Sequence, residues 1–489
     1  MLFSKSINKF FTMIMNIKNK FIIASSITIA SLSIASCNKE NLNPIPQTVI
    51  SDASAFSTPD RILQQVFGVY SQVKNGNFLG GRTHVYNDVR GEDWVNVTGN
   101  GVTALGVWNY SIVSTDNQVE NQWAVAYSAI NRANVLLQGI DANSSILNAN
   151  LANRYRAEAR FCRALTNFYL VNCYGRRPFN ADAGASLGIP LRVNASTGSS
   201  GAALARSTVA QVYSAILDDL NFAETNLPLT YAGSSDSNTV RAHRNSAIAL
   251  KTRVYMHMNR WNDVITEGNK IVSTSAPFQA SSGVAHRLNA AFLTTFRTYN
   301  TTESIFSLPM TNLNSPGGQN GLALYHNAEF ALNPTGIIAE AGWRTADARR
   351  SLIVNAVAPF RYSKFNDDLN NYVPIIRYSE VLLNLAEAIA RTTSGVDSRA
   401  LSLLNAVRQR SDAGVTLAPA TNADLINAIL LERRIEFLGE GIRALDIQRQ
   451  NIAFPAKGSL QPVLPTTLPY VWPIPASEIL YNSLAVPNS

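Results

Sequence analysis

Residues 375–391 read IIRYSEVLLNLAEAIAR and predict an amphipathic helix. Leu382, Leu385 and Ile389 fall on one helical face, because residues three, four or seven positions apart lie on the same side of a helix. The opposite stripe consists of Glu380, Asn384, Glu387 and Arg391. A helix of this kind buries its apolar face against neighbouring helices. The stretch therefore favours a protein built mainly from packed helices.

A second stretch, LERRIEFLGEGIRALDIQR at residues 431–449, is rich in charges of both signs. Glu432 and Glu436 lie one helical turn apart, and a pair of carboxylates can carry out the acid–base chemistry of a glycosidase. The same pair can also form ion pairs with basic residues at helical spacing. The charged neighbours are Arg433, Arg434, Arg443, Asp446 and Arg449. We favour the ion-pair network, because the charges compensate one another and no nearby residues indicate a substrate cleft.

Helical periodicity continues in separate blocks along most of the chain. Thr58 or Ser57 and then Pro59 are typical of a helix start, and Ser207 or Thr208 begins another helix in the same way. The other expected helices cover residues 119–139, 151–174, 244–259, 375–392, 397–411, 422–438 and 441–450. Consecutive helices with short connections are typical of helix–turn–helix repeats, which bury their apolar faces by stacking.

Two regions lack this periodicity, namely residues 275–374 and the stretch from Trp94 to Tyr110. Both mix Ser, Thr, Asn and Gly with aromatic residues. Long irregular segments within a compact protein are usually functional, and binding residues concentrate on loops that a rigid frame carries. We expect these two regions to face a ligand.

The candidate ligand-binding residues in these regions combine aromatic rings with polar neighbours. Sugar rings stack their apolar C–H faces on aromatic side chains, while amides and charged groups bind the hydroxyls. The candidates are Trp94, Asn96, Trp108, Tyr325, Trp343 and Arg344. Trp94 and Trp343 are preferred among them because polar residues or glycine flank both, although core packing is the competing role for each aromatic residue.

The first 36 residues have the features of a secretory signal. Lysines at positions 5, 9, 18 and 20 precede the run FIIASSITIASLSIAS from Phe21 to Ser36, which is too short and too rich in serine for a membrane span. The run ends at Cys37 in the pattern Ile-Ala-Ser-Cys, which resembles a bacterial lipobox. We expect residues 1–36 to be removed and Cys37 to carry a lipid anchor; translation can begin at Met1, Met13 or Met15.

Removal of this signal changes the charge of the protein. The whole chain of 489 residues has 41 Lys and Arg against 33 Asp and Glu, a net charge of +8. The signal contains four lysines and no acid, so the remaining 453 residues have 37 basic against 33 acidic residues, a net charge of about +4. A chain this close to neutral does not indicate nucleic-acid binding.

Cysteine and histidine usage gives no sign of a metal or redox centre. The chain has three cysteines, too few for a disulfide framework, and Cys162 and Cys173 are too far apart along one helix to pair. There is no HExxH or CxxC motif among the five histidines and three cysteines. We expect no metal and no cofactor.

Several blocks together resemble the SusD/RagB family of outer-membrane nutrient-binding lipoproteins. They are residues 155–179 (YRAEARFCRALTNFYLVNCYGRRPF), 375–391, 431–449 and 471–482 (VWPIPASEILYN), in this order behind the lipobox. The resemblance covers nearly all of the mature chain. Two departures are Ala444, where the family often has tryptophan, and Ser483 after Asn482, where an Asn-Pro pattern is usual.

The resemblance implies a mostly α-helical fold with tetratricopeptide-like helix pairs and long irregular ligand-binding loops. It implies an N-terminal region at 37–230 and a C-terminal region at 231–489, packed as one globular unit. It also implies a non-enzymatic receptor, lipid-anchored in the outer membrane and exposed at the cell surface, that passes oligosaccharides to a SusC-like TonB-dependent transporter. The alternatives are a receptor for peptides or another nutrient, a glycan-degrading enzyme, and a helical-repeat assembly protein.

Overall fold

The computed structural model describes residues 52–198, 203–355, 357–366 and 372–488. The expected signal and Cys37 lie outside these residues. The chain divides into two compact units, Met1–Ala55 and Phe56–Ser489. The first contains α3 (Asp52–Ala55), and the description below concerns the second.

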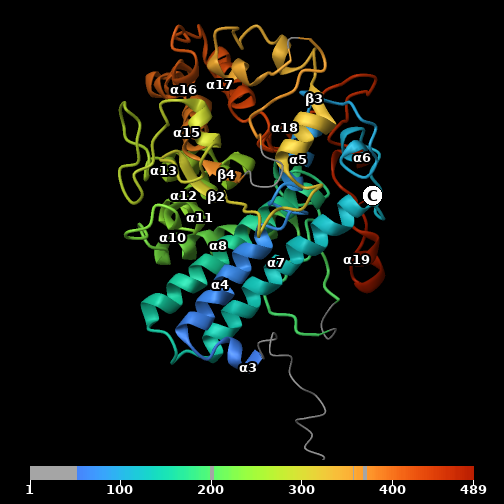
Figure 1. The fold of residues 1–489 in the computed structure, drawn as a ribbon, viewed down its shortest axis with the longest axis vertical. Helices are drawn as coiled ribbons and strands as arrows, with labels where there is room; N and C mark the ends of the chain where they lie inside the picture. The colour runs from blue at the N-terminus through green and yellow to red at the C-terminus, as the bar shows by residue number, and fades with distance from the viewer. Residues whose placement is uncertain (1–51, 199–202, 356, 367–371, 489) are drawn as a thin grey trace, which may run out of the picture. The chain divides into compact units, whose positions relative to one another are not determined.

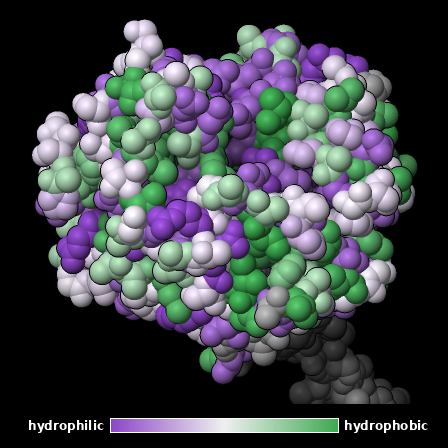
Figure 2. Space-filling view, turned by 90° about the horizontal axis from the view of Figure 1, so that it is seen from above, coloured by the Kyte–Doolittle hydropathy of each residue, from purple (hydrophilic) through white to green (hydrophobic). Residues whose placement is uncertain are grey.

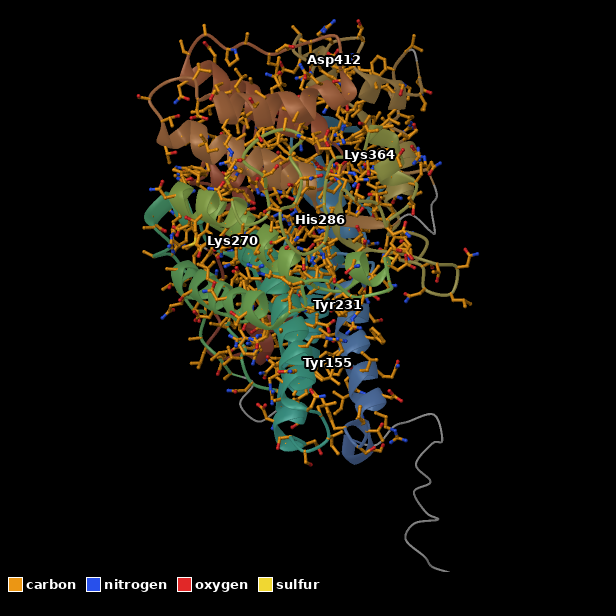
Figure 3. All side chains as sticks on the ribbon, turned by 90° about the vertical axis from the view of Figure 1, so that its left-hand side faces the viewer. Tyr155, Tyr231, Lys270, His286, Lys364 and Asp412 are labelled. Carbon is orange, nitrogen blue, oxygen red and sulfur yellow. The ribbon has the colours of Figure 1, made fainter. Side chains whose placement is uncertain are left out.

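One side of this second unit is a layer of long helices that lie side by side (Figure 1). They are α4 (Pro59–Val73), α7 (Asn117–Ala142), α8 (Ala149–Tyr174) and α10 (Val209–Asn226). α8 contacts the other three. Aromatic residues of this layer, such as Tyr155, lie well apart from Lys364 and Asp412, which belong to the opposite side (Figure 3).

Two of these helices begin where the sequence predicts. The Thr58 hydroxyl accepts a hydrogen bond from the amide of Arg61, with Pro59 as the first residue of α4. Thr208 and Gln211 exchange side-chain and backbone hydrogen bonds in a capping box at the start of α10. Both caps satisfy amides that have no partner within the helix.

The end of α7 differs from the prediction. The sequence suggests that the helix ends at Gly139, yet α7 continues to Ala142. A Cβ atom at this position would lie 2.1 Å from Cζ of Phe56, so only glycine leaves room for that ring against the helix. This glycine serves close packing and does not end the helix.

The opposite side of the unit is formed by helices from the second half of the chain. They are α12 (Arg244–His257), α13 (Trp261–Gly268), α15 (Tyr378–Thr392), α16 (Ser398–Ser411) and α17 (Asn422–Glu436). Successive members pack on one another, and α10 and α12 join the two layers. Seen from above, the unit is hollowed near its centre, and hydrophilic residues lie in the hollow (Figure 2). The predicted mostly α-helical fold is confirmed.

Short elements fill the connections. The short α-helices are α5 (Arg82–Val89), α6 (Leu105–Trp108), α9 (Phe179–Asp182), α11 (Ser237–Val240), α14 (Leu322–Leu324), α18 (Arg443–Arg449) and α19 (Ala476–Tyr481). The other helical turns are η1 (Phe292–Phe296), η2 (Tyr325–Glu329), η3 (Ile337–Ala339), η4 (Ala348–Leu352) and η5 (Leu468–Tyr470). The described parts of residues 275–374 are therefore irregular, as the sequence predicts, and contain only short elements.

Two short antiparallel sheets pair segments that are distant in sequence. β1 (Trp94–Asn96) pairs with β3 (Phe330–Leu332), and β2 (Ser304–Leu308) pairs with β4 (Val373–Arg377). The helix expected from residue 375 begins at Tyr378 instead, because Ile375 and Ile376 belong to β4. β-branched residues favour the extended conformation, and the partner strand β2 stabilises it here.

Two further findings concern the described helices and the cysteines. None of the helices within the described ranges is long and apolar enough to cross a membrane. Cys162 and Cys173 are both free thiols and both buried. Contacts also cross residue 230, since Arg241 forms an ion pair with Glu158 of α8; the proposed boundary at that residue stays a prediction.

Candidate ligand-binding site

A surface loop of residues 97–104, between β1 and α6, is closed by one carboxylate from a distant segment. The amide of Val97 donates to the carbonyl oxygen of Glu329 at 3.1 Å and extends the pairing of β1 with β3. Asn96 also donates to that carbonyl, at 3.5 Å. The loop is thereby attached to the end of η2.

The side chain of Glu329 then organises the interior of this loop. Its carboxylate accepts hydrogen bonds from the hydroxyls of Thr98 at 2.5 Å and Thr103 at 3.1 Å, and from the amide of Asn100 at 3.2 Å. All three donors are neutral. Glu329 itself is only 8% exposed, while Val97, Thr98 and Gly99 are exposed. The loop is therefore fixed from below and open to solvent above.

A half-buried aromatic residue, Trp108, lies at the end of α6, the helix that follows the loop. Its indole Nε1 donates to the carbonyl oxygen of Trp94 at 2.8 Å, which ties α6 to β1. We name the group of Asn96, Thr98, Asn100, Thr103, Trp108 and Glu329 the β1 loop site. It combines an accessible ring with amides and hydroxyls, which is the chemistry that a sugar requires.

Three of the predicted aromatic residues are buried in this structure. Trp94 is 1% exposed and stacks on His326 with ring centroids 4.6 Å apart. Tyr325 is fully buried, and its hydroxyl donates to the carbonyl of Gln319. Trp343 is 1% exposed, and the guanidinium of Arg350 lies over its ring. A ring that stacks on a ligand needs an accessible face, so these three rings serve packing in the arrangement described.

The remaining candidate, Arg344, is at the surface and near another polar group. Its side chain is 43% exposed and forms an ion pair with Asp412 at 3.3 Å. The segment that precedes it is connected to the base of β1, because Arg434 binds both Glu340 and Asp93, at 2.8 and 2.5 Å. Arg434 thus connects the two predicted regions. Of the six residues predicted to bind a ligand, Asn96 and Trp108 belong to the β1 loop site.

Sequence reasoning missed Glu329, Thr98 and Thr103 as parts of the site. Glu329 stands alone as an acid before the apolar run Phe330–Leu332, a pattern that marks a carboxylate at the end of a buried strand. Its partners follow Asn96 by only a few residues, but they lie 226 or more residues away from Glu329 in sequence. No local pattern connects the two segments.

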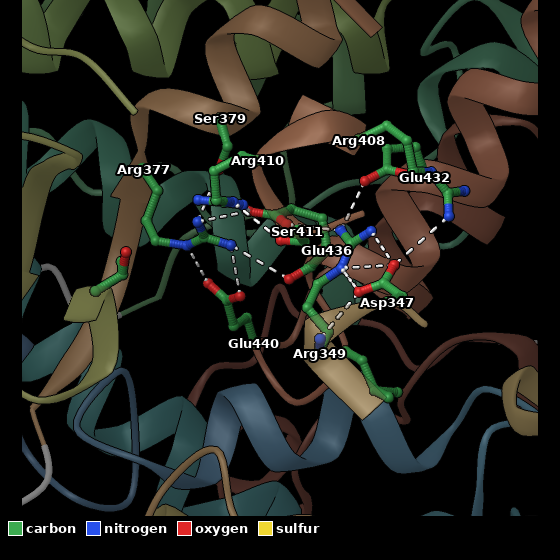
Figure 4. Close-up of polar contacts among 12 residues, drawn as sticks. Asp347, Arg349, Arg377, Ser379, Arg408, Arg410, Ser411, Glu432, Glu436 and Glu440 are labelled. Carbon is green, nitrogen blue, oxygen red and sulfur yellow. Dashed lines mark hydrogen bonds and ion pairs between the residues drawn. The ribbon is translucent and has the colours of Figure 1, made fainter. Parts of the chain in front are cut away.

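A second polar cluster lies inside the protein and joins the irregular region to α16 and α17 (Figure 4). We name it the buried ion network. It contains five carboxylates and five cations: Glu303, Asp347, Glu432, Glu436 and Glu440, with Arg349, Lys364, Arg377, Arg408 and Arg410. Each of these side chains is at most 4% exposed. The charges therefore balance without help from solvent.

Arg349 and Arg377 are at the centre of this network. Arg349 contacts Glu432 at 2.6 Å and Glu436 at 2.9 Å. Arg377 contacts Glu436 at 2.9 Å and Glu440 at 2.7 Å. Burial on its own would raise the pKa of Glu436, but the neighbouring guanidinium groups outweigh it and hold that pKa well below its ordinary value.

The predicted ion-pair role of residues 432–449 holds, with partners that differ in part from those expected. Arg449 binds Asp446 at 2.7 Å at helical spacing, and Arg433 of the neighbouring helix α17 binds the same carboxylate at 2.9 Å. Glu432 and Glu436 instead bind arginines from other segments, among them Arg349. Fully paired and buried carboxylates are not available to a substrate.

A separate groove of about 820 Å³ lies beside the C-terminal segment. Its lining is mostly apolar and contains no charged side chain; it includes Tyr110, Ile112, Val113, Leu468, Ile474, Ile479 and Leu480. Leu480 is 73% exposed and belongs to α19, which has no buried residue. The groove offers few groups for sugar hydroxyls. Within the described ranges, no cluster of three or more His, Cys, Asp or Glu residues could hold a metal ion.

Comparisons with known proteins agree with the fold. A sequence model described as "Starch-binding associating with outer membrane" matches residues 47–256, and the model of the SusD family matches residues 286–488. The SusD-like protein P2 of Formosa agariphila is 24% identical over 530 aligned positions, which cover 94% of this chain and 97% of that protein.

Solved structures give the same result. A SusD superfamily protein from Bacteroides fragilis is 33% identical, has a TM-score of 0.80, and is matched over 88% of this chain and 99% of its own. A laminarin-binding SusD-like protein is 20% identical with a TM-score of 0.67, matched over 88% of this chain and 99% of its own. On the fold, the two family matches and these relatives, the chain belongs to the SusD family.

Proposed function

We propose that this protein is a cell-surface receptor that binds an oligosaccharide at the β1 loop site. The observation that carries the proposal is the position of the half-buried Trp108 beside a loop of amides and hydroxyls that Glu329 holds in place. The description of the matching family as starch-binding and the laminarin-binding relative support a glycan ligand. Asn96 and Trp108 contact the sugar, whereas the buried rings of Trp94, Tyr325 and Trp343 serve packing, and Arg344 is a further candidate at the surface.

The receptor delivers this glycan to a SusC-like TonB-dependent transporter in the outer membrane. Cys37 carries the lipid that anchors it there, on the outer face of the membrane. The expected outcome of Cys37→Ala is release of the protein from the membrane fraction, since several buried acyl chains are needed for stable attachment. Membrane association that persists in this variant would contradict the anchor, and failure of the tagged receptor to co-purify with a barrel transporter would contradict the partner.

The receptor carries out no chemistry of its own. Glycosidases generally use two carboxylates on either side of the scissile bond. Glu432 and Glu436 are buried and paired, and the β1 loop site contributes one carboxylate, which three neutral donors already occupy. Incubation of the purified protein with laminarin, starch and xylan should release no reducing ends, and measurable turnover would refute this part.

The direct test is retention of the purified protein in native gels that contain one of these polysaccharides. We expect at least one of them to slow migration relative to a protein of similar size without affinity for glycans. Isothermal titration with oligosaccharides of the retained polymer then gives the affinity. Normal migration in every gel of a broad panel would contradict the glycan proposal.

A second candidate ligand is a peptide or another apolar nutrient, and the uncharged groove beside α19 favours it. Apolar grooves with exposed aliphatic rims bind apolar side chains well and sugars poorly. Leu480→Glu, at an exposed position of the groove, should abolish binding of an apolar peptide library and leave glycan retention unchanged. Loss of glycan retention in this variant would instead place the sugar in the groove.

A further inference from the structure

Lys457 is buried beside the β1 loop site without a carboxylate partner. It lies in a short turn, where its amide and that of Leu460 exchange hydrogen bonds with each other's carbonyl groups. The residue is 2% exposed. Its ammonium donates to the carbonyl oxygens of Val89 and, at 3.2 Å, Gly91. Within the part of the chain that the structure describes, no ion pair neutralises it.

Two aromatic rings complete the surroundings of this ammonium. Nζ lies 4.4 Å from the ring centroid of Tyr110 and 5.6 Å from that of Trp108. A buried cation without an anion costs free energy, which carbonyl dipoles and the negative faces of aromatic rings offset in part. A less costly residue could fill this place if packing alone were needed.

The position of Lys457 defines how Trp108 is held. The hydrogen bond from Nε1 to the carbonyl of Trp94 fixes one edge of the indole, and the ammonium of Lys457 lies over the ring. Because Lys457 is buried, the part of Trp108 that it covers is not the part that solvent reaches. The accessible part of the indole is thus left for a ligand.

We propose that Lys457 is a positioning residue of the β1 loop site, whose buried ammonium fixes the indole of Trp108 in the orientation that receives a sugar ring. The proposal rests on the function proposed above. On this proposal, the affinity for the ligand depends on the ammonium of Lys457, although the ligand does not contact that group.

The charges around Lys457 are themselves engaged. Arg90 donates to the carbonyl of Tyr470, Glu92 pairs with Arg443, and Asp93 pairs with Arg434. Burial, together with the repulsion from Arg90, lowers the pKa of Lys457 well below its ordinary value of 10.5, while Glu92 and Asp93 oppose this shift. Burial raises the pKa of the Tyr110 hydroxyl, so that group stays protonated in the same range.

This direction gives a test that separates positioning from stability. As the pH rises, the folded protein loses the Lys457 proton before the unfolded chain does. The contribution of this group to the free energy of unfolding therefore increases with pH. If Lys457 served stability alone, its deprotonation would leave the orientation of the Trp108 indole unchanged. If Lys457 positions Trp108, its deprotonation changes that orientation.

The first experiment follows Trp108 alone. The emission of the Trp108→Phe variant is subtracted from that of the wild type, since the chain has six tryptophans. As the pH is raised to about 10.5, the ordinary pKa of lysine, we expect the difference spectrum and its quenching by acrylamide to change in one step, with no loss of melting temperature. The Lys457→Arg variant, which keeps its charge, should lack this step. No step in the wild type, or the same step in Lys457→Arg, would overturn the proposal.

The second experiment measures binding in laminarin gels at a pH below this step. Lys457→Met should weaken retention roughly fivefold, the equivalent of a moderate cation–π contact, and Lys457→Arg should restore most of it. Equal retention of Lys457→Met and wild type would overturn the proposal. If the wild type is not retained by laminarin or any other polysaccharide, the glycan function fails, while the spectroscopic step still decides whether Lys457 holds Trp108.

Discussion

The buried ion network and the β1 loop site both attach irregular segments with glutamates, but the partners of those glutamates differ. Glu436 is completely buried and accepts from guanidinium groups, whereas Glu329 accepts from two hydroxyls and an amide beneath an exposed loop. Charged partners bind strongly where water is excluded. Neutral partners hold a loop in shape and leave its surface uncharged. The comparison agrees with a structural role for the first region and with the proposal that the second region binds an uncharged ligand.

The largest expected effect is the removal of one cation from the buried ion network. Arg349→Met leaves Asp347, Glu432 and Glu436 without a shared partner, and we expect it to lower the free energy of unfolding by about 3–5 kcal/mol. Denaturant unfolding measures the change. Arg260→Ala is the matched control, because its ion pair with Asp263 is exposed and should contribute less than about 1 kcal/mol. Equal changes in the free energy of unfolding for the two variants would contradict the role of the buried ion network in maintaining the fold.

Acid should act on the same network. The pKa of Glu436 is lower in the folded protein than in the unfolded chain, so its stabilising contribution is complete above about pH 4.3 and is lost as the pH falls below that value. Asp88, whose pKa burial raises, works in the opposite direction. Below about pH 4, we expect the melting temperature of the wild type to decrease. The difference in melting temperature between the wild type and Arg349→Met should become smaller in the same range. A difference in melting temperature that does not change with pH would contradict this account.

At the β1 loop site, the largest effect should come from the half-buried ring of Trp108. Trp108→Ala should weaken polysaccharide binding roughly tenfold by titration calorimetry, because it removes the stacking surface, and should change the melting temperature little. Trp261→Ala is the control, since Trp261 is also half-buried and lies against Arg391 of another helix. If Trp94→Ala or Trp343→Ala reduces affinity while the fold persists and Trp108→Ala does not, the ligand lies elsewhere.

The smallest effect should come from loosening the loop without touching the ring. Glu329→Gln keeps an acceptor but replaces one carboxylate oxygen by a donor, and we expect a roughly two- to fivefold loss of affinity. Hydrogen exchange at residues 97–103 should become faster. Glu340→Gln serves as the control, because its carboxylate is 45% exposed and pairs with Arg434. Unchanged exchange in the loop would mean that Glu329 does not hold it.

Local sequence signals predicted much of the helical frame. The starts of α4 and α10 depend on residues within three positions, Thr58 with Arg61 and Thr208 with Gln211, so the sequence contains all the information they need. Residues 375–377 were predicted incorrectly as helix, because their strand needs a partner some 70 residues away. Pairing of that kind cannot be read from one segment.

The site was harder to predict for the same reason. Trp94 and Trp108 have similar polar neighbours in sequence, yet His326 covers the ring of Trp94, and Trp108 stays half-buried. The difference arises from a residue more than 200 positions away. Polar flanks therefore do not distinguish the buried ring of Trp94 from the ring of Trp108, which solvent reaches.

The distance between Glu329 and its loop has a consequence for the order in which the protein is made. A protein chain is synthesised from its amino terminus. Residues 97–104 are therefore made long before Glu329, whose carboxylate holds this loop. The same delay applies to β1, whose partner strand follows Glu329 directly. A nascent chain that has folded its first helices has therefore not yet formed its ligand surface. Binding competence at the proposed site therefore arises late in synthesis.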